Sequence, residues 1–396
     1  MKTSNLFAIL NGKFQVNIDT VEFDVEGASV RDINTTTVTI KGPDGQFRGS
    51  RSNRLSIPGV DGRHALQIRY IERPEHLGRP GILHVEGSPF ANTYGQNVYT
   101  SANLRRGCIL ALKAIEEQID FTASEDAWAR WKAGDIELRR VDLAVNFDLG
   151  SVQAVRSYLD RLAHQVVSQR CHSHVYDKFV SVIPRNGSEY GITVYAKGEQ
   201  LKFNLKANTE PNFVRLVEES QALMRIEVRL RRKELEKLKL STVSDWTPER
   251  AREVFRTYAD RLPTLDVLSG PLEPAELQGL PSNLRAVYAI HKTGTDLKMI
   301  YAARTLARHR ATLRKLGVDI NCPALPDAPL NDDLNVRPMK TPQWMIDARM
   351  APRKKAKKTT RNTRAEVRPV SAEFRPSDLE TPSSPSQTTV DYGYLI

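Results

Sequence analysis

The chain is poor in cysteine and has no long apolar run. Its 396 residues include three cysteines, Cys108, Cys171 and Cys322, which lie far apart and form no CxxC pair. This usage fits reduced thiols in a cytoplasm and offers no zinc site. No run of about 18 apolar residues occurs, so we expect no membrane-spanning helix. The apolar run in the opening "MKTSNLFAILNGKF" is too short for a secretory signal, and no small-residue cleavage site follows it.

Negative charge is also in deficit. The 58 Lys and Arg outnumber the 47 Asp and Glu, giving a formal net charge of +11 and a pI of about 9.5. Such a chain favours polyanions, either nucleic acid or anionic lipid. Because we find no basic amphipathic helix with bulky aromatics and no lipidation signal, we expect no membrane partner. A general RNA- or lipid-binding protein would explain the charge alone.

The first part of the chain is predicted to be an α+β domain. After an N-terminal extension (1–12), residues 13–242 alternate apolar and polar residues between turns such as "GPDG" and "GVDG". Helical spacing occurs at 104–121 and at 151–167, where Ser151 is a plausible N-cap. The pattern predicts an antiparallel sheet with helices, and its clearest strands are at 138–147, 172–183, 190–198 and 222–231.

A second, all-helical module is expected at 243–322. Thr247 caps a helix with Pro248 in its first position, and the apolar face of this helix is Ala251, Val254, Phe255, Tyr258 and Leu262. Farther on, Gly294 can make a tight turn before the helical stretch 301–316, which predicts a helix-turn-helix-like arrangement. His309 falls on the apolar stripe of that stretch and is predicted to be a packed core residue.

Arginines crowd the rest of the surface of this last helix. We expect them to contact phosphates or guanine edges of DNA, although plain solvated arginines would give the same pattern; they are Arg304, Arg308, Arg310 and Arg314.

The tail at 323–396 loses periodicity and is rich in Ser, Thr and Pro. Its segment 349–361 carries seven Lys or Arg in thirteen residues. We interpret the tail as disordered, with the basic run adding sequence-independent affinity for phosphates.

Two strands place a carboxylate among arginines on a polar face. In "RRVDLAVNF" Asp142 lies opposite the apolar residues, and in "LMRIEVRL" Glu227 lies beside Arg225. Tyr195 and Lys197 share the polar face of a third strand. Tyr176 lies on the polar face of a fourth strand. If these strands are neighbours, the face can hold a divalent metal ion, steer a phosphodiester through Arg225, and offer a phenol as nucleophile. Solvated strand faces with weak ion pairs are the alternative.

Several stretches together resemble the rolling-circle replication initiators of filamentous phages, of the gene II, Cri and RstA type. They are "NIDTVEF", the block 83–104 with "EGSP" and "YGQN" where the family has EGNP and QGHN, "RRVDLAVNFDL", "VYAKGEQL", "LMRIEVRLRRKEL" and 301–320. The likeness spans about 15–320, and the number and order of the motifs make it specific. The family's histidine is replaced here.

The resemblance implies an origin-specific DNA nickase of the bacterial host cytoplasm. Such an enzyme uses Mg²⁺ or Mn²⁺, links its tyrosine to a 5′ phosphate, later rejoins the displaced strand, and works on double- and single-stranded origin DNA with host helicase and polymerase. By similarity, Asp142 and Glu227 are expected as metal ligands. Asp19 is a further candidate, although it shares the alternation of Val21 and Phe23, so a structural role is equally open.

The nucleophile remains open between two tyrosines. Tyr176 is slightly preferred, in which case Tyr195 and Lys197 would contact DNA and Lys197 would neutralise a phosphate. A non-catalytic DNA-binding replication modulator or repressor is the alternative function. The combination of Asp142, Glu227 and both tyrosines favours the enzyme.

Overall fold

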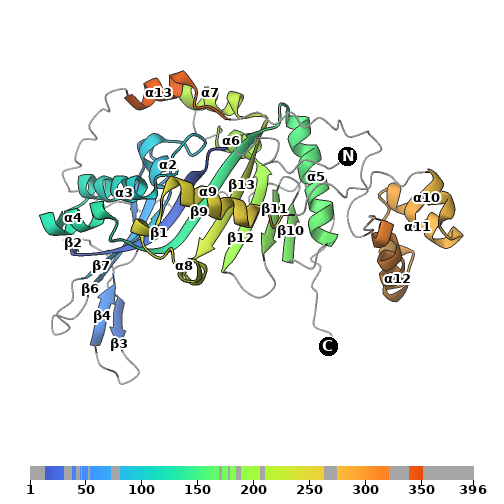
Figure 1. Cartoon of the computed structure of the whole chain (residues 1–396), viewed down its shortest axis with the longest axis horizontal. Coiled ribbons are helices and arrows are strands. Elements are labelled where there is room, and N and C mark those ends of the chain that lie inside the picture. The colour runs from blue at the N-terminus through green and yellow to red at the C-terminus, as the bar shows by residue number, and fades with distance from the viewer. Residues whose placement is uncertain are drawn as a thin grey trace. The chain divides into compact units, whose positions relative to one another are not determined.

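A large antiparallel sheet forms the scaffold of the protein (Figure 1). The computed structural model describes residues 14–30, 38–41, 45, 47–51, 54–72, 81–168, 172–176, 179–183, 189–205, 210–262, 274–316, 318, 320 and 339–350. Within them the sheet has 11 strands in the order β10-β11-β12-β13-β9-β1-β7-β6-β4-β3, with β5 paired to β6. Every strand pair resolved there is antiparallel, so the predicted α+β class is confirmed.

Among the described elements the strands β1 to β7 come first, helices and strands are interspersed from α2 to β13, and helices follow. The strands are β1 Asn17–Glu26, β2 Ala28–Val30, β3 Val38–Lys41, β4 Phe47–Arg51, β5 Leu55–Ile57, β6 Leu66–Glu72, β7 Ile82–Gly87, β8 Phe121–Ala123, β9 Glu137–Asp148, β10 His172–Tyr176, β11 Phe179–Ile183, β12 Tyr190–Ala196 and β13 Leu223–Arg231. The α-helices are α2 Pro89–Tyr94, α3 Leu104–Gln118, α4 Glu125–Ala133, α5 Val152–Ser168, α6 Lys197–Leu205, α7 Pro211–Glu219, α8 Arg232–Leu238, α9 Pro248–Ala259, α10 Pro274–Gly279, α11 Ser282–Lys292, α12 Ala303–Leu313 and α13 Gln343–Met350. Short 3-10 helices are η2 Val243–Asp245, η4 Leu297–Met299 and η5 Arg314–Leu316. No helix in the described ranges has both the length and the hydropathy to cross a bilayer.

Both predicted helix caps are present. The Ser151 hydroxyl accepts a hydrogen bond from the Ala154 amide at 3.1 Å. The Thr247 hydroxyl accepts one from the Arg250 amide, also at 3.1 Å, with Pro248 next to the cap. Each hydroxyl satisfies one of the unpaired amides at the start of its helix, which is worth about 1 kcal/mol.

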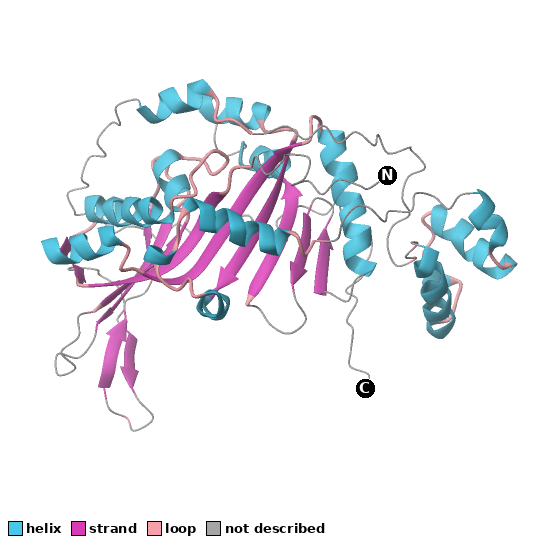
Figure 2. Ribbon diagram, in the orientation of Figure 1, coloured by secondary structure: helices cyan, strands magenta, loops and turns pink. Residues whose placement is uncertain are grey.

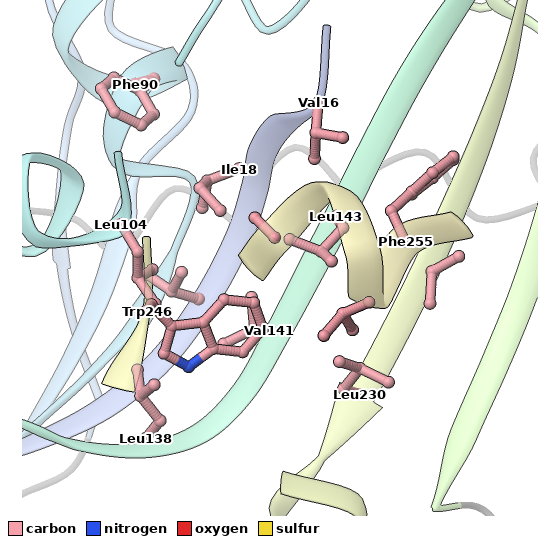
Figure 3. Close-up of a cluster of buried hydrophobic side chains, with 14 of the residues drawn as sticks. Val16, Ile18, Phe90, Leu104, Leu138, Val141, Leu143, Leu230, Trp246 and Phe255 are labelled. Carbon is pink, nitrogen blue, oxygen red and sulfur yellow. The ribbon is translucent and has the colours of Figure 1, made fainter. Parts of the chain in front are cut away.

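The main core lies on one face of the sheet. Val141, Leu143, Val145 and Phe147 of β9 alternate onto that face and are all buried. The helices α3, α4, α5 and α9 contribute to the same core, and α3, α4 and α9 lie over the sheet in Figure 2. Figure 3 shows residues from both layers in this core, among them Leu143 of β9 and Phe255 of α9. Each fully buried side chain of this kind contributes about 1.5–3 kcal/mol.

Helix α9 belongs to the sheet domain. Its predicted apolar face is buried, and that face joins the core beneath β9 and β13. We expected the helical module to start at residue 243, but α9 packs in the core of the sheet domain, so the module starts after α9. The module's own core starts after α9 and contains Leu284, Val287, Leu297 and Leu313, with Gly294 at φ 74° in the turn after α11. Sequence periodicity identifies an apolar face but not the element it packs against.

Helix α13 lies in the region that was expected to be a disordered tail. Met345 is buried in a cluster with residues of α6 and α7 and with Val98 and Tyr99. The Trp344 indole donates hydrogen bonds at 3.0 Å to both carboxylate oxygens of Glu219. Figure 1 shows α13 beside α7. The helix has 8 residues, too few to be stable alone, so its order depends on a partner surface that local sequence does not reveal.

Candidate nucleic-acid cleavage site

The predicted site residues of the sheet domain lie on neighbouring strands. Glu227 on β13 is the register partner of Thr193 on β12 and of Ala144 on β9. Partners across an antiparallel pair project to the same face. The polar face predicted for β9 and β13 is therefore continuous, and it is the face opposite the main core.

A β-bulge brings Asp19 to this polar face. Strict alternation would place Asp19 with Val21, whose side chain is in the core. Between Ile18 and Val21, however, the register of β1 against β9 shifts: Ile18 pairs with Leu143 and Val21 with Val141. One extra residue on β1 reverses the side to which the intervening residues point. The Asp19 carboxylate consequently lies 2.8 Å from Arg225 on β13.

Arg225 is a buried bridge between two carboxylates. Its side chain has no exposed surface; Nη2 lies 2.8 Å from Asp19 Oδ1 and Nε lies 2.9 Å from Glu227 Oε1. The angles of these two ion pairs fall short of hydrogen-bond geometry, whereas Nη1 donates a 2.7 Å hydrogen bond to the Asn97 carbonyl. The expectation that Arg225 contacts DNA from an open face does not match this burial.

Tyr195 is paired with Glu227. Its phenol donates a 2.7 Å hydrogen bond to Glu227 Oε1. Burial, with the nearby Glu227 carboxylate, raises the pKa of Tyr195 well above its ordinary value. Burial and the proximity of Asp19 also raise the pKa of Glu227. The phenol therefore stays protonated at rest and has an acceptor of increased basicity beside it.

Lys197 opens helix α6 instead of continuing the strand. The strand β12 ends at Ala196, and the Lys197 ammonium donates hydrogen bonds to Asn97 Oδ1 at 2.8 Å and to Gln200 Oε1 at 2.5 Å. Burial, assisted by the Arg225 guanidinium, lowers the pKa of Lys197 to about 7. For Asp19, burial alone would raise the pKa, but Arg225, Lys197 and Asn97 outweigh it and hold the pKa below its usual value.

Asn97 is a site residue that the sequence reasoning did not single out. Its amide donates to Asp19 Oδ1 at 2.9 Å while its amide oxygen accepts from Lys197. Gln96 fixes the turn by accepting from the amides of Val98 and Tyr99 at 2.7 and 2.9 Å. The block "YGQN" contained the signal, since a polar turn within it carries both residues. We call Asp19, Asn97, Tyr195, Lys197, Arg225 and Glu227 the tyrosine cluster.

Asp142 lies on the same face but outside the tyrosine cluster. Its carboxylate oxygens are held by Arg140, with Nε 2.8 Å from Oδ1, and by Arg229, with Nε 3.3 Å from Oδ2. Asp142 is the register partner of Arg229 rather than of Glu227. Asp142 and Glu227 are therefore diagonal neighbours on the same face, and the group directly opposite Asp142 is Arg229.

Tyr176 lies in the same cross-strand row as Tyr195 but farther out. Tyr176 pairs with Phe179, and Phe179 pairs with Tyr195, so the two tyrosines are separated by strand β11. Two strand spacings amount to about 10 Å. The side chain of Tyr176 lies outside the described part of the structure.

The arginines of the helical module lie on or directly after α12. Arg304 and Arg308 are exposed and Arg310 is half-buried, while the Arg314 side chain lies outside the described residues. His309 is buried, and its ring makes an edge-on contact with Tyr301 at 5.8 Å, which confirms the prediction of a packed histidine.

Oxygen ligands for a divalent cation are available in the tyrosine cluster. Oδ1 of Asp19 and Oε1 of Glu227 are engaged by neighbours, whereas Oδ2 and Oε2 accept no hydrogen bond from a described residue. The described residues contain no group of three or more His, Cys, Asp and Glu suited to a metal. Magnesium, however, commonly binds one or two carboxylates together with water and substrate phosphates. Asp19 Oδ2 and Glu227 Oε2 are therefore hard oxygen ligands of the type that Mg²⁺ and Mn²⁺ bind.

Comparison with known proteins covers the part of the chain that carries the tyrosine cluster. A family model described as the N-terminal part of the phage gene II replication-associated protein matches residues 17–249, a range that contains the whole tyrosine cluster. The corresponding replication-associated protein of Enterobacteria phage I2-2 is 27% identical over 248 residues, which are 61% of this chain and 71% of that protein. The chain therefore belongs to the gene II family of replication-associated proteins, the filamentous-phage rolling-circle replication initiators that its motifs resemble.

Proposed function

We propose that this rolling-circle initiator is a metal-dependent, origin-specific DNA nickase and strand-rejoining enzyme with Tyr195 as its nucleophile. The observation that carries the proposal is the 2.7 Å hydrogen bond from the Tyr195 phenol to Glu227, beside the cations of Lys197 and Arg225. Family membership supports nicking in general. The position of Tyr195 within the tyrosine cluster, compared with Tyr176 beyond β11, favours Tyr195 over the tyrosine preferred from sequence.

The cleavage step is a transesterification. The Tyr195 oxygen attacks the scissile phosphorus while Glu227, already its hydrogen-bond acceptor, takes the phenolic proton. The bond from phosphorus to the 3′ oxygen breaks, and that oxygen leaves as a hydroxyl after taking up a proton from water, while Glu227 later returns the phenolic proton to water. The products are a 5′-phosphotyrosine and a free 3′ hydroxyl. Attack of a 3′ hydroxyl on the phosphotyrosine reverses the step and rejoins the strand.

Cations of the chain offset charge on the transferring phosphoryl group. The Lys197 ammonium is held by two amide oxygens and keeps a third N–H for a phosphate oxygen. Asp19 and Glu227 are the residues that would hold Mg²⁺ or Mn²⁺, whose chemistry is to withdraw negative charge from phosphate oxygens. Asp142 forms ion pairs with Arg140 and Arg229, and it would stabilise the polar face of the sheet rather than bind the metal.

The helical module would supply duplex recognition. Helices α11 and α12 pack through Val287 and Leu313, and Arg304 and Arg308 are exposed on α12. We propose a helix-turn-helix-like reader of origin DNA, as expected from sequence. Host helicase and polymerase would act after the nick, in the host cytoplasm.

The test uses supercoiled plasmid carrying noncoding DNA from the genome that encodes this chain. The protein is incubated with it and with Mg²⁺ or Mn²⁺, and the products are resolved on a denaturing gel. We expect a nick with protein attached to the 5′ end, which Tyr195→Phe abolishes and Tyr176→Phe retains. The reverse result would move the nucleophile to Tyr176. DNA binding without a nick in either metal would leave a non-catalytic replication modulator or repressor.

A further inference from the structure

The loop between β5 and β6, residues 58–65, is held by internal hydrogen bonds and lies near the tyrosine cluster. The Gly59 amide donates to the Arg63 carbonyl and the Gly62 amide to the Gly59 carbonyl, each at 2.9 Å. A Cβ at Gly59 would lie 2.3 Å from the Arg63 oxygen, so only glycine fits there. Asp61 also binds the Arg63 side chain at 2.9 Å and 2.7 Å. The loop therefore has a single defined shape.

Helices on two sides hold this loop in place. From α2, the Asn92 amide group donates to the carbonyls of Ile57 at 3.2 Å and His64 at 3.1 Å. From α7, the Phe213 ring lies 4.5 Å from the Arg63 guanidinium. Helix α2 ends at Tyr94, and its C-cap Gly95 comes directly before the turn that carries Asn97. The fastening therefore connects the loop to the segment that orients Asp19 and Lys197.

His64 has a backbone conformation that side chains rarely adopt. Its φ is 50°, and the only other described non-glycine residue with a positive φ is Lys239, at 57°. Lys239 is the C-cap of α8, an ordinary place for this conformation. His64 caps no helix. Strain of this type is found at functional sites more often than elsewhere.

The imidazole of His64 lies close enough to the tyrosine cluster to interact with two of its charged groups. It interacts electrostatically with Asp19 and Lys197 as well as with Asp61 and Arg63. No described residue forms a hydrogen bond with the ring, although the His64 carbonyl is bonded. Burial, aided by the cations of Arg63 and Lys197, lowers the pKa of His64. A neutral imidazole has one N–H donor and one acceptor to offer.

We propose that the imidazole of His64 donates a hydrogen bond to a non-bridging oxygen of the DNA phosphodiester that Tyr195 attacks. This inference rests on the proposed nickase function. A phosphodiester is the anion that must reach this place, and a neutral N–H donor can bind it without adding another charge to a cluster that already holds Lys197 and Arg225. The fastened loop and the strained backbone keep the ring where it can make that bond.

Two substitutions separate the imidazole from the backbone conformation. His64→Gly removes the ring and accepts the positive φ freely, while His64→Asn also tolerates this conformation and keeps an N–H donor. Lys239→Gly is the matched control, because it relaxes the other positive φ at an exposed position outside the site. Melting temperatures of all three variants show whether folding is preserved.

The measurement is single-turnover cleavage of a single-stranded oligonucleotide that carries the mapped nick. One non-bridging oxygen at the nick is replaced by sulfur, each stereoisomer in turn. We expect His64→Gly to slow cleavage of the normal oligonucleotide about 10- to 100-fold, the loss of one hydrogen bond to a charged group. His64→Asn should lose less, Lys239→Gly nothing, and added imidazole should restore part of the rate of His64→Gly.

Sulfur substitution gives the decisive comparison. One stereoisomer should slow the wild type by a factor that His64→Gly no longer shows, because the contact is already absent. Equal sulfur effects in both proteins would overturn the inference, as would a loss of Mn²⁺ affinity in His64→Gly with unchanged sulfur effects. If the wild type forms no adduct at all, the proposed nickase function fails, and the inference fails with it.

Discussion

The Asn97 side chain makes hydrogen bonds that neither an aspartate nor an alanine could make at its position. Its amide group binds Asp19 and Lys197 together, and the backbone carbonyl of Asn97 binds Arg225. An aspartate there could not donate to Asp19, and an alanine would leave buried charged groups with fewer partners. Buried polar groups without partners cost about 1–3 kcal/mol each. The amide is therefore matched to a place between one carboxylate and one ammonium.

A pH-dependent contribution is expected from Asp24, on the same sheet face. Asp24 accepts from Arg139 at 2.7 Å and lies 2.7 Å from His84 Nδ1. Burial alone would raise the pKa of Asp24, but His84 and Arg139 outweigh it and lower the pKa below 3.8. The pKa of Asp24 is lower in the folded protein than in the unfolded chain. The stabilisation from ionised Asp24 is therefore fully present above pH 3.8 and is lost as the pH falls through the folded-state pKa.

We therefore expect Asp24→Asn to lower the free energy of unfolding by about 1–3 kcal/mol at neutral pH. The difference from wild type should shrink as the pH falls below about 4. Urea unfolding at a series of pH values measures it. Asp135→Asn is the control, since Asp135 forms an exposed pair with Arg130 at 3.3 Å. A penalty for Asp24→Asn that stays constant down to acid pH would contradict the assignment.

At the scale of elements, a sharp corner between β12 and α6 positions two site residues. Tyr195 is near the end of the strand and Lys197 is the first residue of the helix. Gly198 allows this corner, because a Cβ there would lie 2.5 Å from the Ser220 oxygen and 2.7 Å from the Cα of Gln221. These are backbone atoms just before β13, so they cannot move aside cheaply.

Gly198→Ala should therefore displace the corner. We expect a loss of about 1–3 kcal/mol in the free energy of unfolding and slower formation of the Tyr195 adduct. Gly191→Ala, on the preceding strand β12, is the control, since a Cβ at Gly191 meets no atom within 4 Å. Thermal unfolding and adduct formation of the two variants provide the comparison. Equal stability of both variants would show that a Cβ at Gly198 can be accommodated without displacing the backbone of Ser220 and Gln221.

Alternation along strands could be predicted from sequence because it depends on local pattern alone. β9 and β13 present the apolar and polar faces expected of "RRVDLAVNF" and "LMRIEVRL", and Glu227 was placed correctly on the polar face. The bulge that redirects Asp19 was not predictable, because it depends on the register between β1 and β9. The pairing of Asp142 with Arg229 rather than with the tyrosine cluster also depends on register.

Contacts between distant segments could not be predicted either. Asn97 joins the site from 78 positions away from Asp19 and 100 from Lys197. Helix α13 contacts Glu219 across 125 positions. Neither separation leaves a periodic trace in the sequence. The strand arrangement was thus more accessible than the site, whose members are brought together only by the closed fold.

At the scale of the whole molecule, the proposed function places cleavage and duplex recognition in different parts of the chain. The tyrosine cluster is built on the sheet, and the helical module has a separate core. Substitutions on exposed faces of α12 should therefore change one activity and spare the other.

We expect Arg304→Ala with Arg308→Ala to weaken binding of the mapped origin duplex while leaving cleavage of a single-stranded oligonucleotide unchanged. Each lost phosphate contact should lower the dependence of log K on log salt by about 1. Lys233→Ala with Arg252→Ala removes the same charge from exposed positions of the sheet domain and serves as control. Binding isotherms at several salt concentrations measure the effect. Equal loss of both activities would contradict a separate reading role.

The return of the chain to α7 has a mechanical consequence. Met345 of α13 packs in a cluster with residues of α7, and Trp344 donates hydrogen bonds to Glu219. The helical module lies between α9 and α13 in the sequence, and both of these helices pack with the sheet domain. Docking of α13 therefore closes a loop of chain that contains the module, and the entropic cost of closing such a loop grows only slowly with its length. Loss of the α13 contact would leave the module attached to the sheet domain at one end only.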